Sequence, residues 1–420
     1  MKLRFQDILK SLTLTAAVVL LPASCCRQHK LRFEEQNPQI RMGVTLAGTK
    51  AVISDPDNAN RIKQMIRDSY DGTGQKTGGF GVHGFKEVNH VSTKLFDNMR
   101  VYPDITIGNI NAKPALDDIA DNTKWEYQPL RYWDRNAAAT YQFIAYFPWV
   151  PGEADAQDAS KPYATSATRE QLAQDYDDKE LTLHNVPNWQ FGGDGAMDFM
   201  TTTRRGRYAV DFSTGTVNLS FNHILSQLVI KAYYIGSDKT SDGGVKIKEI
   251  ILSESTDGAG DVLAQGTTDF KQKYYDAKAR QVTVAVDGNS ANKADLGASV
   301  RLFADNNVTV GENEISVPFR NEMIDQPNFE PAVIGSWLMV PHKWQNLKIS
   351  ATFKTGTNDP KTSDGVPVTL GSEVNQYVIQ PAKTYIITLL IDTSGGGLEV
   401  KTVAVKDWSD NDISREVYNW

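Results

Sequence analysis

Cysteine is nearly absent from this chain of 420 residues, which contains only Cys25 and Cys26, side by side near its start. The rest of the chain therefore has no internal disulfide, no cysteine-ligated zinc site and no cysteine nucleophile. Without such cross-links the fold must be stabilised by a hydrophobic core, and a chain of this length is long enough to bury one.

A long apolar segment is also missing. The apolar run from Leu12 to Leu21 is about half of the ~20 residues that a membrane-spanning helix needs, so it does not predict a permanent anchor. The run follows three basic residues, Lys2, Arg4 and Lys10, and precedes two small residues and a cysteine. This order is typical of a bacterial export signal, and it predicts that residues 1–24 are removed.

An excess of basic residues is lacking too. The chain has 44 Lys and Arg residues against 51 Asp and Glu residues, which gives a formal net charge of −7. Nucleic acids and anionic membrane surfaces call for basic patches, so neither is an expected partner. The mild acidic charge is expected to serve solubility.

Motifs for catalysis or metal binding are missing as well. No two of the six histidines are four residues apart, the spacing that places two imidazoles on one helical face for zinc. No Gly-x-Ser-x-Gly nucleophile elbow occurs. Acidic residues within 175–180 and 407–412 are interpreted as solvated faces, because a glycosidase requires a defined separation across a cleft. The sequence predicts no enzyme, no metal and no cofactor.

What the chain does contain is period-two alternation of apolar and polar residues, which predicts strands and an all-β fold. Residues 141–147 are interpreted as a sandwich strand with one buried face, and 385–391 with 398–405 as a hairpin around a glycine-rich turn. The other expected strands are 40–46, 125–133, 197–202, 217–220, 228–234, 245–253, 281–286, 300–303, 314–319, 336–340 and 347–353. Their spacing is typical of antiparallel sandwiches or barrels.

Two stretches, 54–90 and 151–196, are rich in turn residues and are predicted to be loops inserted into this scaffold. The first contains Gly78, Gly79, Gly81 and Gly84, interpreted as a flexible surface loop because no lysine follows them as in a phosphate-binding loop. The length predicts two domains, 51–215 and 216–420.

The junction Ala23-Ser24-Cys25 resembles the lipobox of bacterial lipoproteins. In that motif the cysteine is diacylated and becomes the new N-terminus. The resemblance implies that Cys25 is the lipid attachment site, with Cys26 as the alternative, and that acyl chains anchor the protein to the outer membrane.

Four further segments resemble the fimbrillin family, the type V pilins: 40–51, 125–148, 217–230 and 398–408. The resemblance implies two tandem antiparallel β-sandwich domains of the transthyretin-like kind. It also implies that a trypsin-like protease removes a leader, residues 25–50, that carries the first strand. Lys50 followed by Ala51 matches the family's cleavage site best, and Arg41 is the alternative.

Loss of a strand exposes unpaired backbone groups and apolar pockets, which the strand of another subunit can fill. The expected donor is residues 398–420, although the same residues can instead complete a hairpin of their own domain. The predicted function is therefore a structural or adhesive subunit of a cell-surface fimbria, with other fimbrial subunits as partners.

Two rival functions remain open at this stage. The first is a monomeric surface lipoprotein that binds glycans, for which Trp149, Trp189 and Trp344 are candidate stacking platforms. The second is a secreted hydrolase, which would need acids and a nucleophile in one cleft.

Overall fold

The protein is all-β, as the computed structural model shows for the part of the chain that it describes. The described residues are 37–46, 79–104, 123–156, 161–166, 180–188, 190–191, 197–236, 244–253, 266–273, 299–304, 315–321, 326–341, 343–345, 347–369, 376–395 and 397–408, with single positions at 63, 66, 67, 115, 117, 119 and 323. Within these ranges, no helix is both long and apolar enough to cross a membrane. Two short helices lie among the strands, η2 (Glu153–Asp155) and α3 (Tyr208–Asp211).

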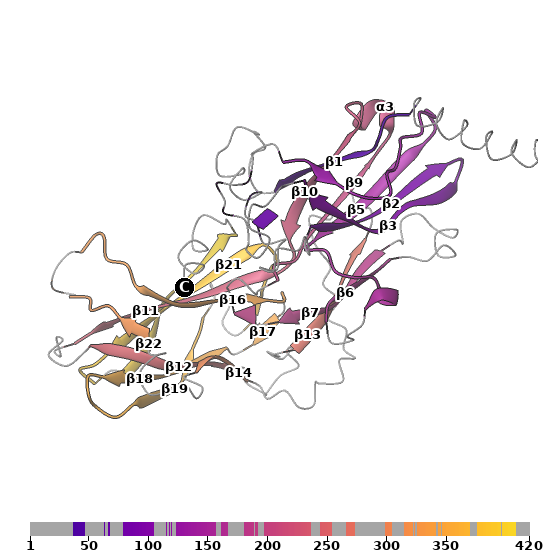
Figure 1. Ribbon diagram of the computed structural model, residues 1–420. Helices are drawn as coiled ribbons and strands as arrows, with labels where there is room; N and C mark the ends of the chain where they lie inside the picture. The colour runs from indigo at the N-terminus through magenta and orange to yellow at the C-terminus, as the bar shows by residue number, and fades with distance from the viewer. Residues whose placement is uncertain are drawn as a thin grey trace, which may run out of the picture.

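Seven strands pair into a closed ring, which lies at the upper right of Figure 1. In order around the ring they are β1 (Arg41–Leu46), β10 (Thr216–His223), β9 (Met200–Gly206), β5 (Thr140–Phe147), β2 (Phe80–Val88), β3 (Val91–Pro103) and β4 (Trp125–Glu126). Apolar side chains from most of these strands fill the ring. We call this filling the ring core.

Two larger sheets make up most of the C-terminal half and lie at the lower left of Figure 1. The first has the order β22 (Gly397–Asp407), β21 (Lys383–Asp392), β11 (Ser226–Ile235), β16 (Ala332–Met339) and β8 (Gln190–Phe191). The second has the order β14 (Ser299–Ala304), β12 (Val245–Ser253), β18 (Lys348–Thr355) and β19 (Lys361–Pro367), with β15 (Ile315–Val317) also paired to β12. One hydrophobic cluster joins residues of both sheets, so they pack as a sandwich.

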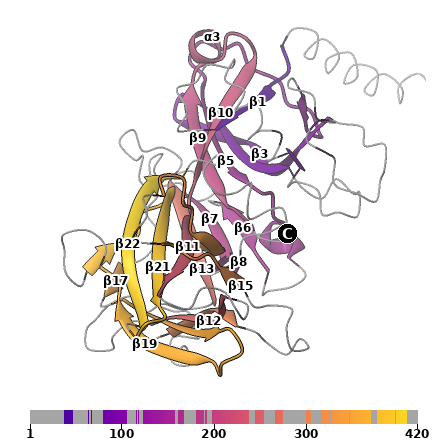
Figure 2. The ribbon, with the colours of Figure 1, turned by 90° about the vertical axis from the view of Figure 1, so that its left-hand side faces the viewer.

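A smaller sheet covers the outside of the ring. It consists of β13 (Gly266–Lys273), β7 (Glu180–Asn188) and β6 (Tyr163–Ser166), seen in the middle of Figure 2. Side chains of β6 and β7 pack against Ile144 and Tyr146 of β5 and against Leu338 of β16. We call this cluster the junction core, because it links the ring to the C-terminal sheets. A two-stranded sheet of β17 (Lys343–Gln345) and β20 (Gln376–Val378) completes the described strands.

Strand β5 is buried on both faces, so the prediction of one buried face was wrong. Tyr141 and Phe143 point into the ring core, whereas Ile144 and Tyr146 belong to the junction core. The alternation in its sequence therefore separates two apolar environments rather than an inside from an outside.

The glycine-rich stretch before residue 90 is a buried strand, which corrects its interpretation as a surface loop. Residues 80–85 of β2 are all buried. Gly81 lies opposite Tyr146, and a Cβ atom there would lie 2.3 Å from that tyrosine ring. The glycine is needed because an aromatic ring occupies the space that any other side chain would fill.

Most other predicted strands are present. The alternation of β10 is reproduced in its burial, and β12 has the predicted bounds. The segment 125–133 was wrong as a strand beyond Glu126, where Pro129 offers no ladder donor. The predicted loop stretch 151–196 contains β6, β7 and β8, and the expected strand 281–286 lies outside the described residues.

Two strand pairs are parallel, which corrects the expectation of purely antiparallel sheets. They are β1 with β10 and β11 with β21. Both pairs join strands far apart in sequence, and such strands are free to pair in either direction, unlike those of a hairpin. The two tandem transthyretin-like domains stay a prediction, and so does the division at residue 215. Along the chain, the last strand of the ring is β10, and the next strand, β11, belongs to the first C-terminal sheet.

Candidate strand-exchange site

Strand β1 closes the ring by lying between two other strands. On one side all six of its residues pair in parallel with β10, from Arg41 with Thr216 to Leu46 with Phe221. On the other side Met42 pairs with Trp125 of β4. Without β1, one edge of β10 would lose the backbone partners that the structure gives it.

The apolar face of β1 points into the ring core. Ile40, directly before the strand, is 0% exposed and Met42 is 5% exposed, while Val44 is partly buried against the same core. The neighbouring β10 contributes Val217 and Leu219. The inward positions on β1 alternate because a strand presents every second side chain to the same face.

The chain just after β4 holds the entry to β1 in place. Ile40 makes two hydrogen bonds to this part of the chain. Its amide donates to the Arg131 carbonyl at 2.9 Å, and its carbonyl accepts the Tyr127 hydroxyl at 2.5 Å. The Trp133 amide donates to the Pro38 carbonyl at 2.9 Å. These bonds fix the position at which β1 begins.

Trp133 adds a second link across the end of the ring. Its indole Nε1 donates to the Gly215 carbonyl at 3.1 Å, and the same carbonyl accepts the Arg41 amide at 2.9 Å. The Trp133 ring is fully buried and stacks on Phe212 with centroids 5.0 Å apart. Sequence reasoning assigned 125–133 to a strand and missed this role; the available signal was the combination of aromatic residues with Pro129.

Of the residues predicted for lipid attachment and cleavage, the structure describes only Arg41. Cys25, Cys26, Lys50 and Ala51 lie outside the described residues, so their roles stay predictions. Arg41, the alternative cleavage residue, is the first residue of β1; its amide donates to Gly215 and its guanidinium donates to the Thr214 carbonyl at 2.6 Å. A backbone held in a ladder is a poor protease substrate, so Arg41 is poorly placed for cleavage.

Of the expected donor, residues 398–420, only 398–408 are described, and they lie almost entirely in β22, which forms a hairpin with β21 from the pair Asp392 and Gly397 onward. The structure therefore has the second of the two arrangements considered for this segment. Apolar residues at Leu398, Val400 and Val403 pack toward the C-terminal core. Leu398 and Val400 are two residues apart, but Val400 and Val403 are three apart, which would place Val403 on the other face of a regular strand. A register shift opposite Thr388 and Leu389 keeps all three on one face. The outer edge of β22 pairs with no other described strand.

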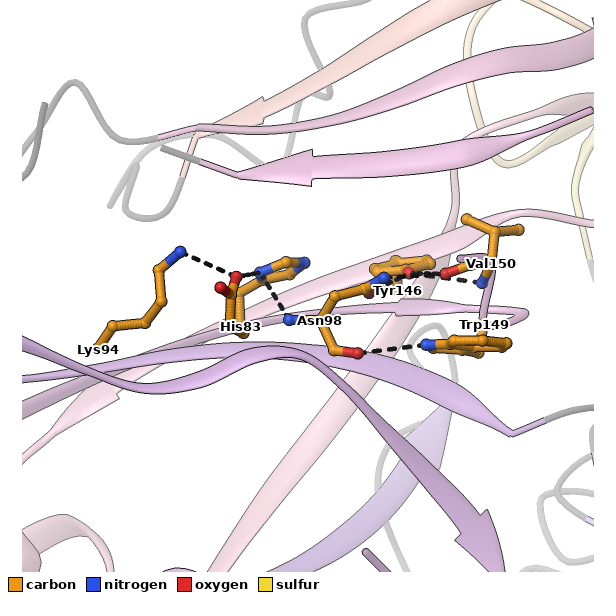
Figure 3. Close-up of polar contacts among 7 residues, drawn as sticks. His83, Lys94, Asn98, Tyr146, Trp149 and Val150 are labelled. Atoms are coloured by element: carbon orange, nitrogen blue, oxygen red, sulfur yellow. Dashed lines mark hydrogen bonds and ion pairs between the residues drawn. The ribbon is translucent and has the colours of Figure 1, made fainter. Parts of the chain in front are cut away.

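Figure 3 shows a polar network between β2, β3 and the end of β5. His83 is 1% exposed, and its Nδ1 accepts a hydrogen bond from the backbone amide of Asn98 at 3.1 Å. Asn98 also accepts the Tyr146 hydroxyl and donates its side-chain amide to the Val150 carbonyl at 3.0 Å. The indole of Trp149 donates to the Asn98 carbonyl at 3.3 Å.

This network is structural rather than catalytic in its composition. Asp97 Oδ1 lies 3.7 Å from His83 Nδ1, but that nitrogen already accepts a hydrogen bond from the backbone of Asn98. The pair is therefore not arranged as a base that activates a nucleophile. Burial is the main cause that lowers the pKa of His83 below its usual value. Trp149 is held by this network, and Arg100 lies over its ring at 5.1 Å, so it is not an exposed stacking platform.

The remaining candidate residues do not converge. Among the described residues, no group of three His, Cys, Asp or Glu side chains is placed to hold a metal ion. Asp407 pairs with Lys383 across the β21–β22 hairpin. His223 ends β10, and its Nδ1 lies 2.7 Å from Asp198 Oδ2.

The packed sheets place this chain among the all-β proteins of β-sandwich architecture, with one strand inserted between two others as a candidate point of exchange. More particularly, the chain belongs to the fimbrillin-like family, whose sequence model matches residues 80–408. Family membership supports a role as a non-enzymatic fimbrial subunit at the cell surface. No curated protein sequence matches the chain.

A solved structure of a fimbrial protein agrees with the fold. A fimbrial protein from Bacteroides vulgatus ATCC 8482 is 15% identical with a TM-score of 0.51, over 89% of this chain and 100% of that chain. The tip fimbrial protein Mfa3 from Porphyromonas gingivalis is 8% identical with a TM-score of 0.35, over 88% of this chain and 100% of that chain.

Proposed function

We propose that this protein is a fimbrial subunit that is exported as a lipoprotein, loses its first strand to a trypsin-like protease and polymerises by strand exchange. Lipid on Cys25 anchors the precursor to the outer membrane, and cleavage between Lys50 and Ala51 separates residues 25–50 from the body. The strand of another subunit then takes the place of β1.

The observation that carries the proposal is the position of β1 between β10 and β4, with Ile40 and Met42 buried in the ring core. Cleavage alone leaves β1 bound, because its ladder and its core contacts do not depend on the peptide bond after Lys50. Release would expose the edge of β10 together with apolar side chains such as Leu219. An incoming strand that restores both the ladder and the burial offsets that cost, so exchange requires subunits to associate.

Strand β22 is the proposed donor. It lies at the edge of its sheet, and its apolar side chains are of the kind that β1 places in the ring core. Its present hairpin with β21 is then the form of the unassembled subunit.

The test uses purified protein that starts at Cys26 and therefore carries no lipid on Cys25. This protein is treated with a protease that cuts after basic residues. We expect a product with Ala51 at its N-terminus and the appearance of polymers in size-exclusion chromatography. Lys50→Gln should prevent both, whereas the matched variant Arg41→Gln should prevent neither. Polymers formed equally well by Lys50→Gln would contradict proteolytic maturation at this residue, and a cut but monomeric chain would contradict strand exchange.

A further inference from the structure

The C-terminal end of β22 is attached to the ring by a single aromatic side chain, Trp408. Its ring stacks on His223, with centroids 4.1 Å apart and an angle of 10° between the planes. Its backbone amide donates to the Ala382 carbonyl at 3.0 Å. The indole is half-buried and packs against the junction core.

The ring residues that receive Trp408 are themselves held firmly. His223 is the last residue of β10 and pairs with Met200 at the start of β9. Its Nδ1 lies 2.7 Å from Asp198 Oδ2, just before β9 begins. The imidazole is therefore fixed from one side by Asp198 and presents its flat face to the indole. The contact joins the last described strand to two strands of the ring.

The residues just before Trp408 pair with β21 through their backbones, but their side chains bury little surface. All four residues from 404 to 407 are exposed, and Val405 is 42% exposed. Asp407 pairs with Lys383, but ion pairs at the surface contribute little to stability. The apolar burial of β22 lies nearer its start, where Leu398 is only 6% exposed.

We propose that the Trp408–His223 stack is the latch that positions the C-terminal half of β22 in its own sheet, and that the latch opens before the strand is offered to another subunit. The second part rests on the proposed donation of β22. Asp198 is a positioning residue in this device, because its carboxylate lies 2.7 Å from the His223 Nδ1 and orients the imidazole. The stack is well suited to the task because it adds an aromatic contact at the end of a segment whose own side chains are exposed.

The first experiment measures hydrogen–deuterium exchange in the full mature chain. Trp408→Ala and His223→Leu should each speed exchange of the β22 amides after Val400 by about tenfold, while β11 and β5 keep their rates, because local opening is independent of global unfolding. Trp408→Phe retains a ring for stacking and should restore most of the protection. Val405→Ala is the matched control on the same strand and should change nothing.

Unchanged exchange in both Trp408→Ala and His223→Leu would overturn the latch. So would acceleration spread evenly over the whole chain, since that would report lost stability rather than a local attachment.

The second experiment separates the latch from the proposed function. Labelled subunits carrying Trp408→Ala are mixed with unlabelled subunits whose β1 has been cut off, and complex formation is followed by size-exclusion chromatography. Faster complex formation than with the unsubstituted donor supports both the latch and the donation. Faster local exchange with no complex from any donor leaves the latch standing and rejects donation. Faster local exchange with an unchanged rate of complex formation shows that opening the latch does not precede donation.

Discussion

Removing β1 should lower the free energy of unfolding of the ring by an amount that can be worked out from its contacts. Ile40 and Met42 are 0% and 5% exposed. Full burial of such a side chain contributes about 1.5–3 kcal/mol, so the two together contribute roughly 3–6 kcal/mol. The hydrogen bonds that Ile40 and Arg41 make to Arg131 and Gly215 add about 1 kcal/mol each. The expected loss is thus on the order of 5–8 kcal/mol, which is comparable to the whole stability of many domains.

The assay is urea unfolding of chain cut after Lys50, before and after the released leader is separated, followed by tryptophan fluorescence. Separation should move the transition to much lower urea, and adding a peptide of residues 37–46 should restore it. The matched control peptide carries Met42→Asp and should restore little, because a carboxylate would be buried in the ring core. If the chain keeps its transition without β1, or if both peptides act equally, the reasoning about β1 is wrong.

Three further outcomes follow from the described contacts. Gly81→Ala should destabilise the protein by about 1–3 kcal/mol in urea unfolding, because its Cβ would overlap the Tyr146 ring. Tyr127→Phe should cost about 0.5–1.5 kcal/mol by removing the hydroxyl that donates to Ile40, and should speed amide exchange of β1 more than of β18. Burial lowers the pKa of His83 from its ordinary 6.5, so the unfolded chain binds the extra proton first as pH falls. The free energy of unfolding should then fall below about pH 6.5 by up to about 1.4 kcal/mol per pH unit, and His83→Gln should remove that part of the slope.

Strands whose two faces meet different environments were predicted well. β10 alternates between buried and exposed positions and β18 between buried and mostly half-buried ones, and the alternation is visible in the sequence because solvent and core select different residues. The hairpin of β21 and β22 was also predicted, since both strands and the turn between them lie in one short segment. Such features depend on neighbours in sequence.

Strand β2 was missed for the opposite reason. Its glycines suggest a turn when only the local chain is considered, and their real cause, the ring of Tyr146, lies on another strand. The hydrogen bonds by which Tyr127 and Trp133 hold the start of β1 were missed in the same way, because each side chain donates to a backbone carbonyl far along the chain. The candidate site was thus half predicted: the strand β1 was foreseen, and its partners were not.

The sequence by itself determined the all-β class and the existence of β1 and β22, because period-two alternation and local turns are set by consecutive residues. The family followed from the resemblance of whole segments and not from that periodicity. Only the tertiary structure decided that β1 runs parallel to β10, that β5 is buried on both faces and that Trp408 rests on His223. Those outcomes depend on which distant surfaces meet, and the free energy that selects among such pairings comes from packing across the whole fold rather than from any local preference.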